Sequence, residues 1–177
     1  MLIDASLGTA SCGGAVMPEQ TPASQRFRPP AEPDDLTIQM NVTQTAIASG
    51  AALPLAGSVR QIGDGLSYDA ANHAVVVNET GVYFFNWNVL VQAAEETTDV
   101  VIALQSLDGT VLLATSGAPA VTADDAVLIS GSAIARLRAG TAWALVNVSG
   151  AAISVPVAGT APAAFAASLN VAEISQQ

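Results

Sequence analysis

The residue types that most often carry enzyme chemistry are scarce in this sequence. His73 is the only histidine, Cys12 is the only cysteine, and lysine is absent. A general base needs an orienting partner, and a thiolate or imidazole metal site needs several such side chains. His73 lies between Asn72 and Ala74 in a predicted turn, where we expect a surface or capping role. The sequence therefore predicts no catalytic residue, no bound metal and no cofactor.

Carboxylates are the remaining candidates for acid–base or metal chemistry. Three adjacent pairs occur: Asp34-Asp35, Glu95-Glu96 and Asp124-Asp125. Each pair falls in a predicted loop, where solvated acids are the simplest interpretation. A calcium site stays open as an alternative, because hard cations prefer several oxygen ligands, although no EF-hand-like spacing is present. Four aspartates are candidate ligands if their loops converge: Asp64, Asp69, Asp124 and Asp125.

The overall composition indicates a protein that buries apolar surface against other subunits. Of the 177 residues, 51% are hydrophobic and only 11% are charged, against roughly 25% charged in an ordinary soluble domain. The longest apolar runs are far shorter than the ~20 residues of a membrane helix. We therefore expect contact with further protein subunits, and no membrane partner. The length favours one domain with a tail.

The charge balance excludes one class of partner. Fifteen acidic residues oppose five arginines, which gives a formal net charge of −10. Such a surface cannot neutralise a phosphate backbone, so we expect no nucleic acid and no anionic membrane as partner.

Residues 1–35 differ in texture from the rest of the chain. They contain several prolines and a Gly13-Gly14 pair, with little alternation of apolar residues, which predicts an extended N-terminal arm. No secretory signal is expected, because the positive and apolar regions of one are missing. A disordered tail or linker is the alternative to an attachment arm. Arg26, Phe27 and Arg28 are candidate attachment residues, equally compatible with an incidental basic patch.

Residues 36–177 read as an all-β sandwich. Short runs rich in Val, Ile and Thr alternate with turn residues such as Asp108-Gly109 and Ser149-Gly150, which is typical of strands joined by turns. Prolines and glycines near 161–167 argue against a helix in that alanine-rich stretch. Strands are predicted near residues 66–69, 74–78, 82–93, 99–105, 110–116, 127–138, 141–149, 152–157 and 165–174.

The segment 81–91 is the strongest strand. Its alternation directs one set of side chains to one face and a mixed set, including Phe84, to the other. The wholly apolar set is Tyr83, Phe85, Trp87, Val89 and Val91. Bulky groups on both faces favour a sheet between its partner sheet and another subunit. The alternative is the central strand of a monomeric sandwich, with Asn86 and Asn88 facing water.

The chain resembles the jelly-roll family of the complement first-component globular head and tumour necrosis factor. The resemblance rests on Leu66-Ser67-Tyr68-Asp69, on Ala74-Val75-Val76-Val77, and on Gly81-Val82-Tyr83-Phe84-Phe85-Asn86-Trp87. It covers roughly residues 45–175. It implies a ten-stranded, two-sheet jelly roll that forms a homotrimer for display or recognition, without catalysis. We expect the trimer interface and core to include Tyr83, Phe84, Phe85, Trp87, Val89, Trp143 and Phe165.

Bacterial and phage relatives of this fold lie on the surface of larger assemblies, and the resemblance implies a similar location for this chain. Because a collagen stalk is missing, we expect a structural protein on a phage virion surface, as a capsid decoration or fibre component attached through residues 1–35. The alternative is a receptor- or carbohydrate-binding tip of a bacterial cell-surface or spore-coat-like filament. Its candidate ligand residues are Trp143, Glu95, Glu96 and Asn72. A jelly-roll depolymerase is a third and weaker hypothesis.

Overall fold

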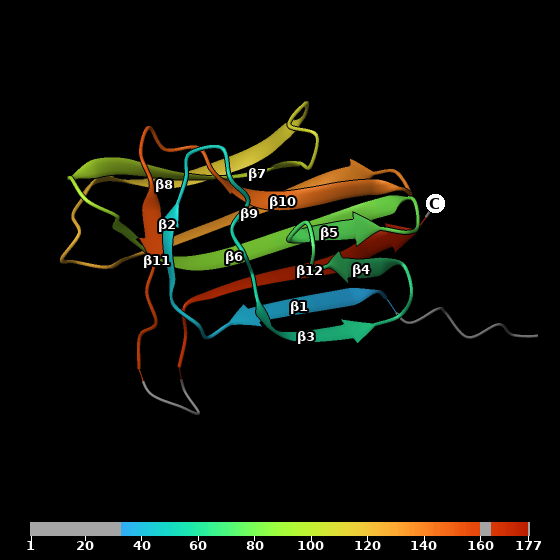
Figure 1. The fold of residues 1–177 in the computed structure, drawn as a ribbon. Helices are drawn as coiled ribbons and strands as arrows, with labels where there is room; N and C mark the ends of the chain where they lie inside the picture. Colours follow the sequence, from blue (N-terminus) through green and yellow to red (C-terminus); the bar gives the residue numbers. More distant parts are fainter. Residues whose placement is uncertain (1–32, 160–163, 177) are drawn as a thin grey trace, which may run out of the picture. The chain divides into compact units, whose positions relative to one another are not determined.

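The fold is seen in a computed structural model that describes residues 33–159 and 164–176. Twelve strands and no helix occur among these residues (Figure 1). The arm residues Arg26, Phe27 and Arg28 lie outside the described part of the chain. The all-β prediction is confirmed, and the nine predicted strands correspond to β4 through β12.

Seven strands form the first sheet. The order is β2-β11-β6-β12-β1-β3, and β9 pairs with the remaining edge of β6. All the pairings are antiparallel, and β6 is the central strand because it pairs with three others. The bounds are β1 Asp35–Met40, β2 Gln44–Ile47, β3 Gly57–Ile62, β6 Gly81–Ala93, β9 Val127–Leu137, β11 Ile153–Val155 and β12 Ala167–Gln176.

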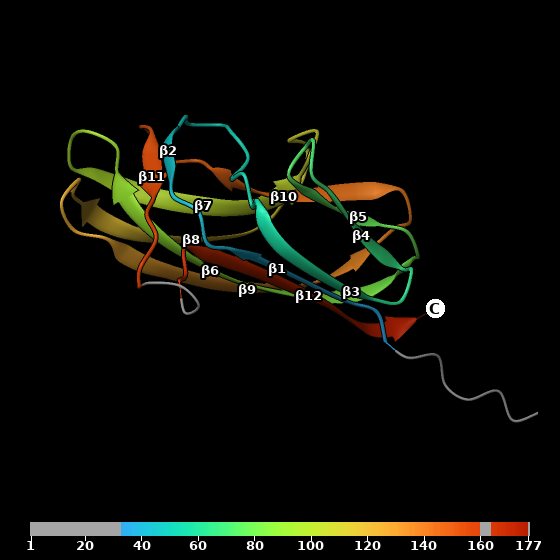
Figure 2. The same cartoon turned by 60° about the horizontal axis from the view of Figure 1, so that its bottom comes forward.

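Five strands form the second sheet, in the order β4-β5-β10-β7-β8. Figure 2 shows the two layers, with β10, β5 and β4 above β6, β12 and β1. The bounds are β4 Leu66–Asp69, β5 Ala74–Val77, β7 Thr98–Ser106, β8 Leu112–Val121 and β10 Thr141–Asn147. The predicted strands did not include β1, β2 or β3; β3 is an edge strand that is exposed along most of its length and lacks an apolar alternation.

The hydrophobic core lies between the two sheets and is centred on the inward face of β6. Tyr83, Phe85 and Trp87 are fully buried there. The indole of Trp87 lies against Gly131 on β9, where an added Cβ would stand 2.2 Å from the ring atom Cζ2. Its Nε1 donates a hydrogen bond to Ser116 Oγ on β8 at 2.8 Å. Because position 131 is a glycine, the indole ring of Trp87 fits against β9 and reaches across the sandwich to the opposite sheet.

The first described residues are part of the sheet structure. Asp35 opens β1 and pairs with Ala172 of β12. Asp34 is only 4% exposed, and its Oδ1 accepts a hydrogen bond from the backbone N–H of Gly65 at 3.0 Å. The prediction that Asp34-Asp35 is a solvated loop pair is therefore wrong. Any side chain at Gly63 or Gly65 would collide with the Asp34 carboxylate, so these glycines make room for it.

Candidate interaction face

The face of the first sheet that points away from the second sheet carries apolar side chains that are exposed in the single protomer. Phe84 on β6 is 37% exposed and its partner in register, Ile134 on β9, is 67% exposed. Ala172 of β12 pairs with Phe84 on the other side, and Ile174 is also exposed. We call the outward-facing side chains of β9, β6, β12 and β1 the outer face.

A polar band crosses the middle of the outer face. Asn86 pairs with Ser132, and Asn88 pairs with Ser130, so amide and hydroxyl groups stand side by side. Ser130 Oγ donates to Asn88 Oδ1 at 2.7 Å. Beyond this band, Leu90 pairs with the exposed Leu128. The face along β6 and β9 therefore carries apolar side chains on both sides of an uncharged band, which suits contact with protein better than contact with bulk water.

Charged groups lie only at the margins of the outer face. Arg136 stands beside Val82 at one end of the β6–β9 pair. Asp35 and Arg60 lie toward the β1–β3 edge. The edge of the sandwich formed by β8 and β9, away from the β1–β3 edge, is also poor in charge. β8 contains no charged residue, and Arg136 is the one charged residue of β9. Long uncharged edge strands pair or aggregate with other chains unless they are covered, so this edge is a second candidate contact surface.

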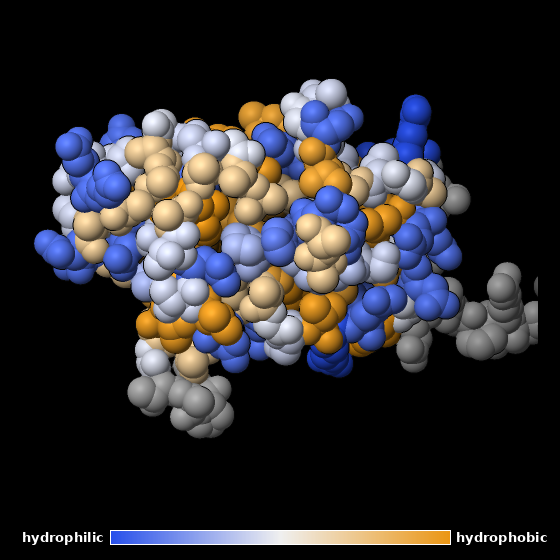
Figure 3. Space-filling view, in the orientation of Figure 1, coloured by the Kyte–Doolittle hydropathy of each residue, from blue (hydrophilic) through white to orange (hydrophobic). Residues whose placement is uncertain are grey.

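Charge-poor surface of this kind is not continuous over the whole molecule. The side shown in Figure 3 has small apolar patches separated by polar and charged residues. Scattered apolar residues of this sort are normal on a soluble protein. The outer face differs because its apolar residues follow the register of adjacent strands.

Most of the residues predicted for the trimer interface and core lie in the core, not on the outer face. Trp143 is nearly buried and packs in the same core. Phe165 is half-buried and bridges Ala158. Four residues are completely inaccessible between the sheets: Tyr83, Phe85, Trp87 and Val89. Phe84 alone among the seven expected residues lies on the outer face. Ile134 and Leu128 were missed, although the alternation within 127–137 could have indicated them.

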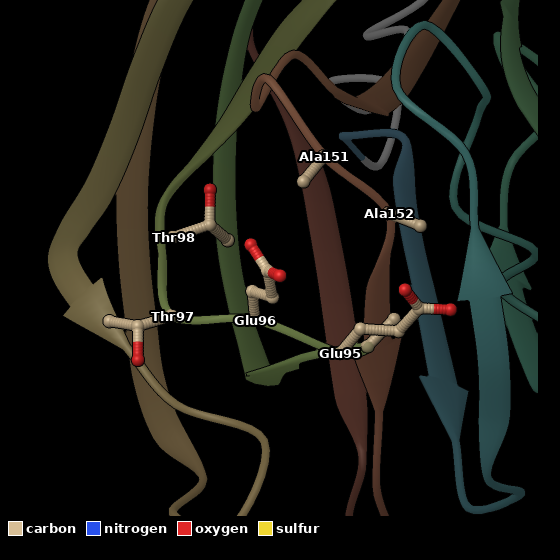
Figure 4. Close-up of a pocket in the computed structure, with 7 residues that line it drawn as sticks. Glu95, Glu96, Thr97, Thr98, Ala151 and Ala152 are labelled. Atoms are coloured by element: carbon tan, nitrogen blue, oxygen red, sulfur yellow. The ribbon is translucent and has the colours of Figure 1, made fainter.

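The residues named for a carbohydrate site do not converge. Glu95 and Glu96 line a pocket of about 260 Å³ with Thr98, and Figure 4 shows their carboxylates extending toward different sides of it. Trp143 lines a different pocket. The side chain of Asn72 donates to Asp69 in the β4–β5 turn at 2.6 Å. These four residues therefore do not form one shared binding site.

Within residues 33–159 and 164–176, no group of three or more His, Cys, Asp or Glu side chains could hold a metal ion. His73 lies in the β4–β5 turn with a φ of 54°, and its buried Nδ1 has no hydrogen-bond partner among the described residues. No hydrogen bond orients this nitrogen in the way that a general base requires. None of the described segments is a helix long and apolar enough to span a bilayer.

Comparison with solved structures identifies the fold. The globular domain of the zebrafish complement 1qA protein has a TM-score of 0.60 at 15% identity, covering 82% of this chain and 100% of its own. Eiger TNF from S. frugiperda has a TM-score of 0.59 at 12% identity, covering 81% and 93%. Murine APRIL has a TM-score of 0.53 at 13% identity, covering 81% and 100%. No protein-family model and no curated protein matches the sequence.

These similarities define the fold of the chain. The chain has the two-sheet antiparallel jelly-roll fold of the complement first-component globular head and tumour necrosis factor. The resemblance seen in the residues around Gly81 is confirmed at the level of the fold. At 12–15% identity the likeness concerns the fold alone, and function follows from the surface.

Proposed function

We propose that this chain is a non-enzymatic homotrimeric structural protein that decorates a virion or forms part of a virion fibre. The observation that carries the proposal is the outer face, where Phe84, Ile134 and Leu128 are exposed in register around an uncharged polar band. Covering this face removes apolar surface from water and stabilises the assembly by roughly 25 cal/mol per Å².

The arrangement of the two contact surfaces favours a ring. The outer face and the β8–β9 edge are different surfaces of one protomer, and a contact between two different surfaces forms a ring when the rotation from copy to copy closes. The resemblance to the jelly-roll family implies three copies around the axis. In such a ring the uncharged edge of one copy covers the outer face of the next, so both charge-poor surfaces are buried together.

The oligomeric state tests the first part of the proposal. Multi-angle light scattering of the full chain should give a mass of about 53 kDa, three times the 17.8 kDa protomer. The double variant Phe84→Asp, Ile134→Asp should give the protomer mass, because desolvating each carboxylate in an apolar contact is costly. Val42→Asp is the matched control, since Val42 is exposed but lies outside the strands of the outer face. A monomeric wild-type chain would contradict the proposal.

The attachment of the trimer is the second part of the proposal. We assign it to the N-terminal arm, with Arg26, Phe27 and Arg28 as the contact residues, because the arm precedes the sheet structure and carries cations in an acidic protein. A deletion of residues 1–32 is the appropriate variant, since it retains the buried Asp34.

Particles purified from the native source should incorporate the tagged full chain and exclude the deletion variant. Light scattering should show that the deletion variant is still a trimer. Replacement of Arg26, Phe27 and Arg28 by alanine should reduce incorporation in the same direction. Incorporation of the deletion variant at the wild-type level would contradict the attachment role and leave the trimer proposal intact. Antibody labelling of intact particles tests the proposed location at the virion surface.

A further inference from the structure

A pocket of about 520 Å³ lies where the β7–β8 and β9–β10 turns meet, and none of its lining residues belongs to the outer face. The backbone N–H of Leu107 donates to the carbonyl of Ala142 at 2.8 Å and joins the β7–β8 turn to the start of β10. Leu107, Val111 and Trp143 supply apolar lining, and Asp108 is the one charged residue that lines it. The volume falls within the range of small-molecule sites.

The side-chain hydrogen-bond donors that line this pocket are all used within the protein. Ser106 Oγ and Thr110 Oγ1 both donate to Asp108 Oδ1, at 2.6 and 2.9 Å. Thr141 Oγ1 donates to the carbonyl of Arg138 at 2.8 Å. Trp143 Nε1 donates to Thr141 Oγ1 at 3.0 Å. The side chains of the pocket therefore offer a ligand acceptors only.

The carboxylate of Asp108 is the principal acceptor left for a ligand. The bonds from Ser106 and Thr110 all end on Oδ1, so none of them occupies Oδ2. The side-chain bond from Ser106, followed by those from Thr110, lowers the pKa of Asp108. The group is therefore ionised throughout the physiological range. A carboxylate beside aliphatic side chains favours a ligand that is cationic, has several hydrogen-bond donors and is partly apolar.

We propose that this pocket binds a primary alkylammonium group, with the ammonium on Asp108 and the aliphatic stem against Leu107 and Val111. An ammonium carries three donors and no acceptor, so it matches a site without free side-chain donors. A sugar hydroxyl also brings acceptors, which would find no side-chain donor here. Because this chain contains no lysine, the group comes from a lysine of a partner protein or from a free alkylamine.

The two tryptophans allow a direct test on the full chain. The indole N–H signal of Trp143 reports on the pocket, and that of Trp87, bonded to Ser116 in the core, is an internal reference. The probes are Nα-acetyl-lysine-N-methylamide, its norleucine counterpart, which lacks the ammonium, and n-butylamine. The lysine probe should shift the Trp143 signal saturably and leave Trp87 unchanged. The norleucine probe should bind at least fivefold more weakly.

A pair of aspartate variants isolates the charge. Asp108→Asn keeps an oxygen for the bonds from Ser106 and Thr110 but removes the charge. It should weaken binding of the lysine probe about fivefold. Asp69→Asn is the matched control, because Asp69 is an exposed turn carboxylate with a similarly lowered pKa that lies outside the pocket. Binding by wild type should persist from pH 7 to pH 5.

The comparison of probes on the wild-type chain and the comparison of wild type with Asp108→Asn each test the proposal. Equal binding of the norleucine and lysine probes, or an unchanged affinity in Asp108→Asn, would overturn the proposal. Tighter binding of the lysine probe than of n-butylamine supports a lysine of a partner chain, and equal binding of the two supports a free amine. Light scattering on the same samples reports the oligomeric state, so failure of this proposal and failure of the trimer proposal are distinguishable.

Discussion

Phe84 and Phe85 are adjacent on β6 and have opposite environments. Phe85 is fully buried between the sheets, whereas Phe84 is 37% exposed on the outer face. The strand period of two puts them on opposite sides of the sheet, so one sequence element serves both the core and the outer face. The comparison explains the high apolar content of the chain, because β6 is apolar beyond what its own core requires.

The largest effect should come from exchanging each of these two phenylalanines for alanine. Phe85→Ala leaves a cavity in the core and should lower the free energy of unfolding by about 3–5 kcal/mol. Phe84→Ala should cost the folded protomer under about 1 kcal/mol and mainly weaken association. Chemical denaturation at one fixed protomer concentration measures the free energy of unfolding, and light scattering before each experiment measures association. Equal losses of folding stability would remove the distinction between the two faces.

The contact between Gly131 and Trp87 tests how closely the inward face is packed. Gly131→Ala places a Cβ 2.2 Å from the indole ring, so the ring or the strand must shift, at a cost of about 1–3 kcal/mol. Gly150→Ala is the control, because no atom lies within 4 Å of its added Cβ. Thermal unfolding should show a lower Tm for Gly131→Ala alone. An unchanged Tm would mean that the indole adapts without cost.

Tyr83 is an inward residue whose proton makes stability depend on pH in the alkaline range. Burial raises the pKa of Tyr83 to about 12, and the carboxylates of Glu173, Asp34 and Glu79 add to this effect. The unfolded chain releases the same proton near pH 10. The native state therefore holds more protons than the unfolded state between pH 10 and 12, and stability falls as the pH rises through this window.

Tyr83→Phe removes this titration and one hydrogen bond, from the Tyr83 hydroxyl to the carbonyl of Glu79. It should cost about 1 kcal/mol at pH 8 and flatten the loss of stability between pH 10 and 12. Tyr68→Phe should flatten it less, although burial and Asp69 also raise the pKa of Tyr68. The absence of lysine keeps the window free of a common competing group. An identical slope in Tyr83→Phe and wild type would refute this assignment.

The sequence predicted the elements whose pattern is local. The alternation in 81–91 predicted both faces of β6, and turn residues located most strands from β4 onward. The burial of Asp34 could not be predicted, because it depends on Gly63 and Gly65, about thirty residues away. The pocket at Asp108 likewise requires two turns distant in sequence to meet. The predicted set for the interface and core did not separate the two faces of the sheet and did not include Ile134, which is exposed on β9.

The smallest effect should come from the polar band of the outer face. Asn88→Ala removes the hydrogen bond between Ser130 Oγ and Asn88 Oδ1, which is exposed in the protomer, so folding should lose about 0.5 kcal/mol at most. A larger change is expected in the trimer, where the freed Ser130 hydroxyl would be buried without this partner. Dilution measured by light scattering should show dissociation at a higher protomer concentration than for wild type. Asn72→Ala, in a turn away from this face, should leave dissociation unchanged. An unchanged dissociation in Asn88→Ala would mean that the polar band stays hydrated in the assembly, and that the apolar ends of the outer face alone make the contact.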